Sequence, residues 1–310
     1  MSFRNILYLA AVLVIAIIVG GCSTPKNTQE EMMRVTADQV YAFQNQKVQK
    51  KLDIFIPLKE QYAGSDHAKS LQTLRESSNN IKPECYQCMS TEYYLAPSDQ
   101  KPNPDSIKLS ITCAVCHVMT PEEFTLKTNP LETCTSCHQN PNQITPGSVV
   151  HHAQKEMFLG YGAIGVPETP DSKYQAGLTC IECHMPNEAH SFEGLTPAKA
   201  IKENRESICV MCHADQSEEQ FARKVDDMQT TIRNTCDQLA KDLEVQDKKI
   251  KENRLLGINM DEAQMVYNIV YTNLSFIQSD MSWGIHNFDY TNEILTYSKE
   301  RQQELDGMLN

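Results

Sequence analysis

Five pairs of cysteines, each separated by two residues, carry the clearest chemistry in this chain. Four of the pairs are followed directly by a histidine, and the remaining pair is followed by Met89. A Cys-x-x-Cys-His run is the attachment signature of haem c, because the thiols can bond to the porphyrin while the adjacent imidazole binds the iron. The pattern therefore predicts covalently bound haem and redox chemistry. The pairs are Cys85/Cys88, Cys113/Cys116, Cys134/Cys137, Cys180/Cys183 and Cys209/Cys212, and the motif histidines are His117, His138, His184 and His213.

Two other uses of paired cysteines compete with haem attachment. The second and third pairs are spaced as in a four-cysteine zinc site, but zinc does not require a histidine directly after the second cysteine. The first pair ends in Met89 instead of histidine, so a redox or structural disulfide between Cys85 and Cys88 stays open there. We expect four haems at the histidine motifs and a fifth at Cys85/Cys88, with Met89 as a candidate ligand.

The remaining histidines match the demand for second axial ligands. A six-coordinate haem needs a ligand on each face of the iron and transfers electrons, whereas a haem with one open face can bind a substrate. The chain has nine histidines, and four of them belong to the motifs. We therefore predict that the other histidines supply the distal positions, with at least one of the adjacent pair among the ligands. These histidines are His67, His151, His152, His190 and His286.

The N-terminus predicts export and a membrane tether. Arg4 precedes an apolar run that ends in V-G-G-C at Cys22. A positive residue, an apolar region and small residues before a cysteine resemble a lipoprotein signal peptide, and the alternative is an uncleaved anchor. We expect a signal peptide over residues 1–21, lipidation at Cys22 and a flexible tether over 22–34. The bulk of the protein would then be extracytoplasmic, in the periplasm or at the cell surface.

The net charge limits the class of partner, and the cysteine count leaves one thiol to be explained. The net charge of -12 argues against a nucleic-acid partner. The predicted lipidation site and the five pairs account for every cysteine except Cys236. Because Cys236 falls in a helical pattern, we expect a buried, inert thiol there, with intermolecular pairing as the alternative.

The chain divides into two regions by pattern, and the fold class is mainly α. Residues 35–214 form the predicted multihaem domain, whose first part, to residue 78, is mostly helical by pattern. Residues 81–214 hold every motif and are rich in proline, asparagine and threonine, which predicts short helices and loops around haems. Residues 215–310 carry apolar residues at three- and four-residue steps, interrupted near Gly257. That spacing predicts a long C-terminal helical hairpin, with a kink near Trp283-Gly284 in its second helix.

The order of the motifs resembles that of the pentahaem cytochrome c nitrite reductases, which form ammonia, and of the related hydroxylamine oxidoreductases. One motif without histidine comes first, and four Cys-x-x-Cys-His motifs follow. The segment D-H-A-K-S-L-Q-T-L-R-E-S is similar to the family segment with a distal histidine and an active-site arginine, which map to His67 and Arg75. T-C-I-E-C-H-M-P with the following His190, and W-G-I-H-N with His286, resemble two further family segments.

The resemblance implies a set of ligand pairs. It assigns His67 to the haem at Cys134/Cys137 and His190 to the haem at Cys113/Cys116. It assigns His286 to the haem at Cys180/Cys183. The haem at Cys209/Cys212 is left with His151 or His152, at a spacing that departs from the family.

The first motif of this chain differs from the family at the position where the family holds its catalytic haem. The family has a lysine below the catalytic haem, whereas this chain has Met89, a neutral and weak thioether donor. No tyrosine follows His138 where the family has one, and Arg75 has an equally good interpretation as a surface or propionate-binding residue. The favoured function is electron transfer between a membrane-side donor, such as a quinol oxidase-type partner, and other cytochromes. The alternatives are reduction of nitrite or hydroxylamine at the first haem, and a structural role in a homodimer or larger haem-lined assembly.

Overall fold

The computed structural model describes residues 57–77, 80–120 and 124–310. Apart from residues 57–58, these belong to one compact unit, Lys59–Asn310. The predicted signal peptide, the lipidation site Cys22 and the tether over 22–34 lie outside the described residues. Every helix within the described ranges is too short or too polar to span a bilayer.

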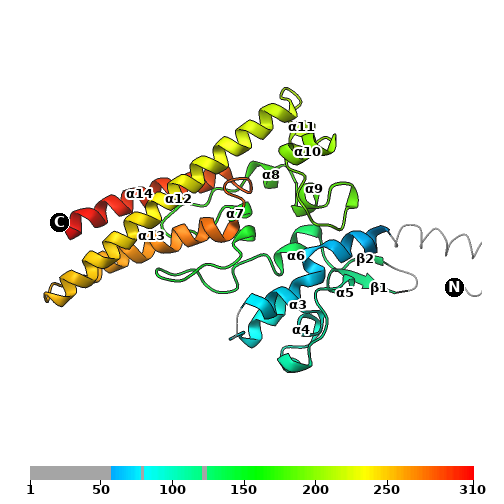
Figure 1. Ribbon diagram of the computed structural model, residues 1–310, viewed down its shortest axis with the longest axis horizontal. Coiled ribbons are helices and arrows are strands. Elements are labelled where there is room, and N and C mark those ends of the chain that lie inside the picture. Colours follow the sequence, from blue (N-terminus) through cyan, green and yellow to red (C-terminus); the bar gives the residue numbers. More distant parts are fainter. Residues whose placement is uncertain (1–56, 78–79, 121–123) are drawn as a thin grey trace, which may run out of the picture. The chain divides into compact units, whose positions relative to one another are not determined.

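Short elements joined by loops make up the region of the cysteine pairs, as the sequence predicts (Figure 1). Residues 57–64 are also helical. Two three-residue strands pair antiparallel, His117 opposite Leu126, and were not predicted because so short a strand shows no alternation. The elements are α3 (Asp66–Ser77), η1 (Pro83–Cys88), α4 (Thr91–Leu95), η2 (Pro104–Ser106), α5 (Cys113–Cys116), β1 (His117–Met119), β2 (Phe124–Leu126), α6 (Pro130–Thr135), α7 (Gln154–Leu159), α8 (Ser172–Gln175), α9 (Cys180–His184), η3 (Pro186–Glu188), α10 (Pro197–Glu203) and α11 (Ile208–Cys212).

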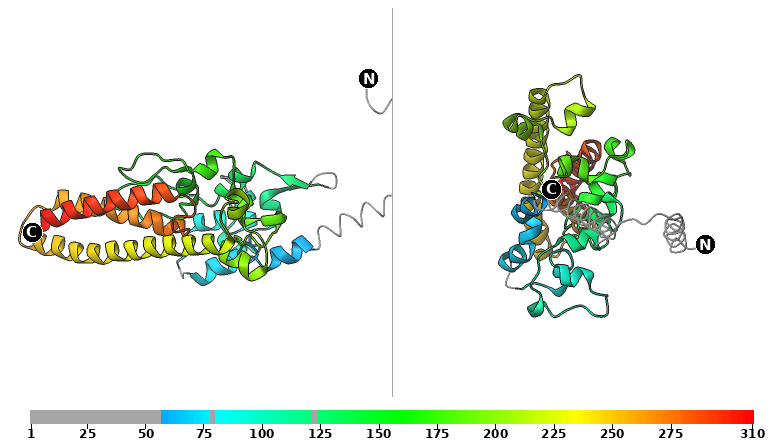
Figure 2. Two further views of the ribbon diagram at one scale, coloured as in Figure 1. Left: turned by 90° about the horizontal axis from the view of Figure 1, so that it is seen from above. Right: turned by 90° about the vertical axis from the view of Figure 1, so that its right-hand side faces the viewer.

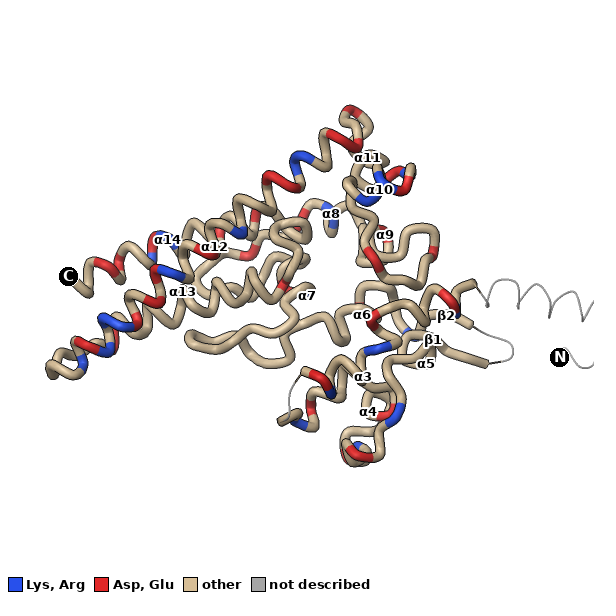
Figure 3. The backbone as a smooth tube through the Cα atoms, viewed as in Figure 1, with Lys and Arg blue, Asp and Glu red and all other residues tan. Residues whose placement is uncertain are grey.

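The C-terminal region forms three long helices, α12 (Glu218–Leu255), α13 (Asp261–Asp280) and α14 (Phe288–Leu309), which lie side by side (Figure 2). A capping box starts α12, in which Ser217 accepts from the Gln220 backbone and Gln220 accepts from the Ser217 backbone. Gly257, at φ +82°, follows the end of α12, as the sequence predicts. Acidic and basic residues alternate along this helix (Figure 3). The prediction of a mainly helical fold with long C-terminal helices is confirmed.

The second predicted helix does not continue through its expected kink. Met281, Trp283 and Gly284 all take positive φ angles, so the chain reverses there and α14 packs back along α13. A left-handed backbone cannot continue a right-handed helix. The predicted two-helix hairpin is therefore a three-helix arrangement, and the reversal carries His286 just before α14.

The main core lies between these three helices. Ile232, Leu239 and Leu243 of α12 pack against Phe276 and other apolar residues of α13 and α14. Cys236 is fully buried in the same cluster as a free thiol, and burial raises its pKa to about 12. The prediction that this thiol is buried is confirmed.

Polar side chains of α13 hold the segment between the third and fourth cysteine pairs. Asn273, fully buried, accepts from the Ile164 backbone N–H at 2.8 Å and donates to the Ile164 carbonyl at 3.0 Å. Thr272 accepts from the Gly147 backbone at 2.9 Å, and Ser275 accepts from the Val150 backbone at 3.0 Å. A segment with little secondary structure is thereby fixed, because buried backbone groups need such partners.

Gly160 should not tolerate a side chain. It ends α7 at φ +70°, and an added Cβ would lie 1.9 Å from the Thr169 carbonyl oxygen. Gly160→Ala should therefore cost roughly 2–4 kcal/mol of unfolding free energy, since it adds a backbone clash to a left-handed conformation. Gly177→Ala is the matched control, because Gly177 has φ +83° with no atom near its Cβ. That control should cost about 1 kcal/mol. Thermal denaturation of both variants measures the difference, and equal losses would contradict the expected clash.

Candidate functional site

Each cysteine pair lies on or beside one short helix, which fixes its local geometry. In η1, α5, α9 and α11 both cysteines fall within the element, and α6 contains the first cysteine of the third pair. Residues three apart lie on one face of a helical turn, so the two thiols of a pair point the same way. All ten are free thiols and none is buried, Cys85 and Cys88 included. The two thiols of a pair are therefore placed to bond to the same planar group.

The pairs also lie next to one another in space. The thiols of Cys88 and Cys137 are close enough to shift each other's pKa, which joins the first pair to the third. Cys134 and Cys180 are joined in the same way, which links the third pair to the fourth. An electrostatic contact between a thiol of the fourth pair and one of the fifth continues the series, and a thiol of the second pair lies near Cys137. The third pair is therefore the centre of the arrangement.

Three histidine pairs stand at nearly equal separations. The ring centres of His67 and His138 are 6.0 Å apart. The corresponding distance is 6.1 Å for His117 and His190, and 6.2 Å for His184 and His286. Each pair joins a histidine that follows a cysteine pair to one from elsewhere in the chain. Ring packing alone also gives such distances, and His138 has a second histidine neighbour, His152, at 6.1 Å. The separation therefore leaves two candidates, His67 and His152, opposite His138.

Comparison with known proteins agrees with this geometry. The family model of cytochrome c552 matches residues 171–310. The crystal structure of outer cell wall cytochrome OcwA is similar with a TM-score of 0.67 and 28% identity, over 78% of this chain and 49% of that chain. The cytochrome c nitrite reductase NrfA from Desulfovibrio desulfuricans matches with a TM-score of 0.55 and 15% identity, over 78% of this chain and 70% of that one. No curated protein sequence matches the chain.

The chain has the fold of the multihaem c-type cytochromes. It spans about half the length of OcwA, and its likeness to NrfA is one of fold. The family implies covalently bound haem c, which fits the five cysteine pairs.

The histidine separations fit haem iron as well. Since a nitrogen–metal bond is about 2 Å long and the ring centre lies roughly 1 Å beyond the nitrogen, two imidazoles on opposite sides of one metal have ring centres about 6 Å apart. The three observed distances equal this value within 0.2 Å. The described residues contain no group of three or more His, Cys, Asp or Glu side chains arranged to hold a metal ion by themselves. The resemblance to the nitrite reductases implied the same three histidine pairs.

Hydrogen bonds at Nδ1 orient several of these rings. His190 Nδ1 lies 2.8 Å from the Glu188 carbonyl oxygen, and His184 Nδ1 lies 3.3 Å from that of Phe192. His286 Nδ1 lies 2.6 Å from Asp280 Oδ1. An acceptor at Nδ1 leaves Nε2 free to bind a metal, as in most histidine-ligated sites.

The environment of His138 favours its neutral form. His138 keeps solvent-accessible surface, but many protein atoms lie around its ring and reduce its contact with bulk water. That burial, together with the nearby imidazoles of His67, His152, His184 and His286, lowers the pKa of His138 to about 4. A neutral imidazole at neutral pH is the form that binds iron.

Among the described residues, the ring contacts of His213 do not include His151 or His152. The aromatic ring beside His213 belongs to Phe221, at 5.2 Å. His152 lies 6.1 Å from His138 and 4.0 Å from His151. The implied pairing of the fifth haem with His151 or His152 therefore has no support from this placement, because the segment of His151 and His152 is held against α13 beside the third motif.

Met89 and Arg75 have other partners. Met89 packs against an apolar cluster that includes Leu71 and Tyr86. Arg75 is exposed and donates to the Ile107 carbonyl oxygen at 2.7 Å, so its side chain supports a loop on the surface.

Two residues near the histidines were not predicted from the sequence. Phe192 packs edge-on against His67, with ring centres 4.5 Å apart. Asp280 is buried and paired with His286. A usable signal existed for Asp280, since it is an acidic residue at the end of an apolar helix, six residues before a predicted ligand.

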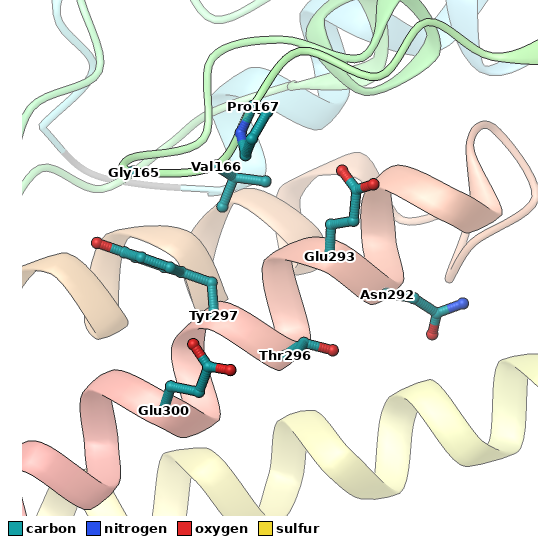
Figure 4. Close-up of a pocket in the computed structure, with 8 residues that line it drawn as sticks. All are labelled: Gly165, Val166, Pro167, Asn292, Glu293, Thr296, Tyr297 and Glu300. Carbon is teal, nitrogen blue, oxygen red and sulfur yellow. The ribbon is translucent and has the colours of Figure 1, made fainter.

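The pocket drawn in Figure 4 belongs to a different part of the molecule. Residues 165–167 and one side of α14, including Glu293, Tyr297 and Glu300, line it. None of its lining residues belongs to a cysteine pair or to a candidate ligand. We therefore assign no role in the haem site to this pocket.

Proposed function

We propose that this chain is a membrane-tethered, extracytoplasmic cytochrome that transfers electrons through four or five covalently bound haems. The observation that carries the proposal is the set of three histidine pairs with ring centres 6.0–6.2 Å apart. Two imidazoles per iron would leave no open face at these three haems, which suits them to electron transfer. The tether would be lipid at Cys22, and the partners would be other redox proteins.

The chain's own residues would control this transfer by position. When bound, the haems would supply the reversible one-electron chemistry of iron. The motif cysteines would fix each group along the series described above, with the third pair next to the first, second and fourth. The hydrogen bonds at Nδ1 would orient the imidazoles of His184, His190 and His286.

Reduction of nitrite or hydroxylamine at the Cys85/Cys88 haem is the alternative. The fold likeness to NrfA and the contact of Cys88 with Cys137 favour it, because they place the first motif beside an electron-supplying neighbour. The exposed position of Arg75 and the apolar packing of Met89 argue against it.

Spectroscopy of the intact holoprotein tests the proposal, together with a haem count. Its mass should fit five haems, and Cys85→Ala/Cys88→Ala should lose one of them. The ferric EPR spectrum should be dominated by low-spin haem, and nitrite or cyanide should change at most the signal that this double variant removes. A high-spin signal from that haem, with reduction of nitrite by the dithionite-reduced protein, would favour the reductase instead. A mass that fits four haems in both proteins would exclude haem at Cys85/Cys88.

A further inference from the structure

Asp280 is a buried carboxylate whose partners are all polar and close. Its side chain is 1% exposed, and Oδ1 lies 2.6 Å from His286 Nδ1. Oδ2 accepts from the Ser282 backbone N–H at 3.2 Å and from the Ser282 hydroxyl. A buried charge is tolerated only when it is paired and hydrogen-bonded, so these contacts fix the ionised carboxylate in place.

The same contacts fix His286. The His286 backbone N–H donates to Ser282 Oγ at 3.0 Å, which closes a ring of hydrogen bonds through Asp280, Ser282 and His286. Gln154 of α7 donates to the Asp280 carbonyl oxygen at 3.2 Å and so holds the end of α13. These contacts orient the imidazole with Nδ1 toward the carboxylate, and its ring centre lies 6.2 Å from that of His184.

This arrangement differs from that of the other oriented histidines. His184 and His190 each have a neutral backbone carbonyl oxygen at Nδ1. Among the described residues, His286 is the histidine whose Nδ1 faces a carboxylate. A carboxylate that accepts from Nδ1–H makes the imidazole more basic, and its negative charge stabilises the more positive oxidation state of a metal bound at Nε2.

We propose that Asp280 is a positioning residue that, through His286, lowers the reduction potential of the haem at Cys180/Cys183 relative to the same haem with a neutral acceptor. The inference rests on the proposed function, in which His184 and His286 are the two axial ligands of that haem. The bound haem would supply the one-electron chemistry, and the role of Asp280 would be to accept the Nδ1 proton of His286 in a hydrogen bond. The haem at the fourth motif is thereby tuned as an electron donor to its neighbours.

Asp280→Asn in the full-length holoprotein tests the inference. Asparagine keeps the size and an oxygen acceptor but removes the charge. Spectroelectrochemical titration should show one midpoint shifted positive, with the ferrous-to-ferric ratio of that haem raised on the order of tenfold at a fixed potential, about 59 mV for one electron. The low-spin signal should be retained. Asp289→Asn, at an exposed residue in the first turn of α14, is the matched control and should leave every midpoint in place.

A second variant separates the inference from the proposed function. His286→Ala should convert one low-spin haem to high-spin. If it does so while Asp280→Asn shifts no midpoint, the role of Asp280 is overturned and the ligand pair stands. If Asp280→Asn itself produces high-spin haem, Asp280 only maintains the fold around His286, and the inference also fails. If His286→Ala leaves all signals unchanged, the ligand pair fails and the inference fails with it.

Discussion

Replacing both Cys134 and Cys137 with alanine should remove one haem and divide the series of haems at its centre. Cys137 contacts Cys88, and Cys134 contacts Cys180, so this pair connects the first pair to the fourth. Intact mass should fall by one haem. Stopped-flow reduction by a dye should change from one coupled process into separate phases, because electrons can no longer redistribute across the gap.

The matched control is the same double substitution at Cys209 and Cys212. This pair lies at the end of the series, next to the fourth pair, so its loss should also cost one haem but leave the remaining haems coupled. Circular dichroism should show that both variants keep the long helices α12–α14, whose core does not include the cysteine pairs. Coupled reduction in the Cys134/Cys137 variant would contradict the central position of the third pair.

His67→Ala should convert one haem from low-spin to high-spin without loss of haem. His67 lies on α3 with its ring centre 6.0 Å from that of His138, and His138 belongs to the third motif. Removal of the imidazole opens the distal face, so cyanide should bind the variant and restore a low-spin spectrum. EPR and optical titration measure both effects, and the haem count should be unchanged because the cysteines remain.

Lys69→Ala on the same helix is the control for the His67 variant. Lys69 is exposed and its ammonium group donates to the Gly64 carbonyl oxygen, so its removal should leave the spin state intact. If the His67→Ala protein stays low-spin and does not bind cyanide, another residue is the distal ligand of that haem. His152, at 6.1 Å from His138, would then be the residue to substitute next.

The sequence predicts the local part of this site well. A cysteine pair and its histidine are neighbours in the chain, so the motif alone defines one side of each haem. The distal partners are not local, since His67 and His138 are 71 residues apart. Composition and spacing could supply only a count of available histidines, and the resemblance to a family supplied the three pairs that the structure brings together.

The features that the sequence missed depend on tertiary packing. The reversal after Asp280 requires positive φ angles at Met281 and Trp283, which no local preference of these residues predicts. The strands β1 and β2 are too short for a pattern. The segment before His152 is held by polar residues of α13, Thr272 at Gly147 and Ser275 at Val150. Such contacts exist only once the helices have assembled.

The close approach of thiols from different motifs has a consequence for how the protein must be made. Cys88 and Cys137, and likewise Cys134 and Cys180, are close enough in the folded chain to shift each other's pKa. In an oxidising compartment, neighbouring thiols of a folded chain without haem would cross-link and block both attachment sites. We therefore expect covalent attachment to precede collapse of this region, with the cofactor joined to a still extended polypeptide.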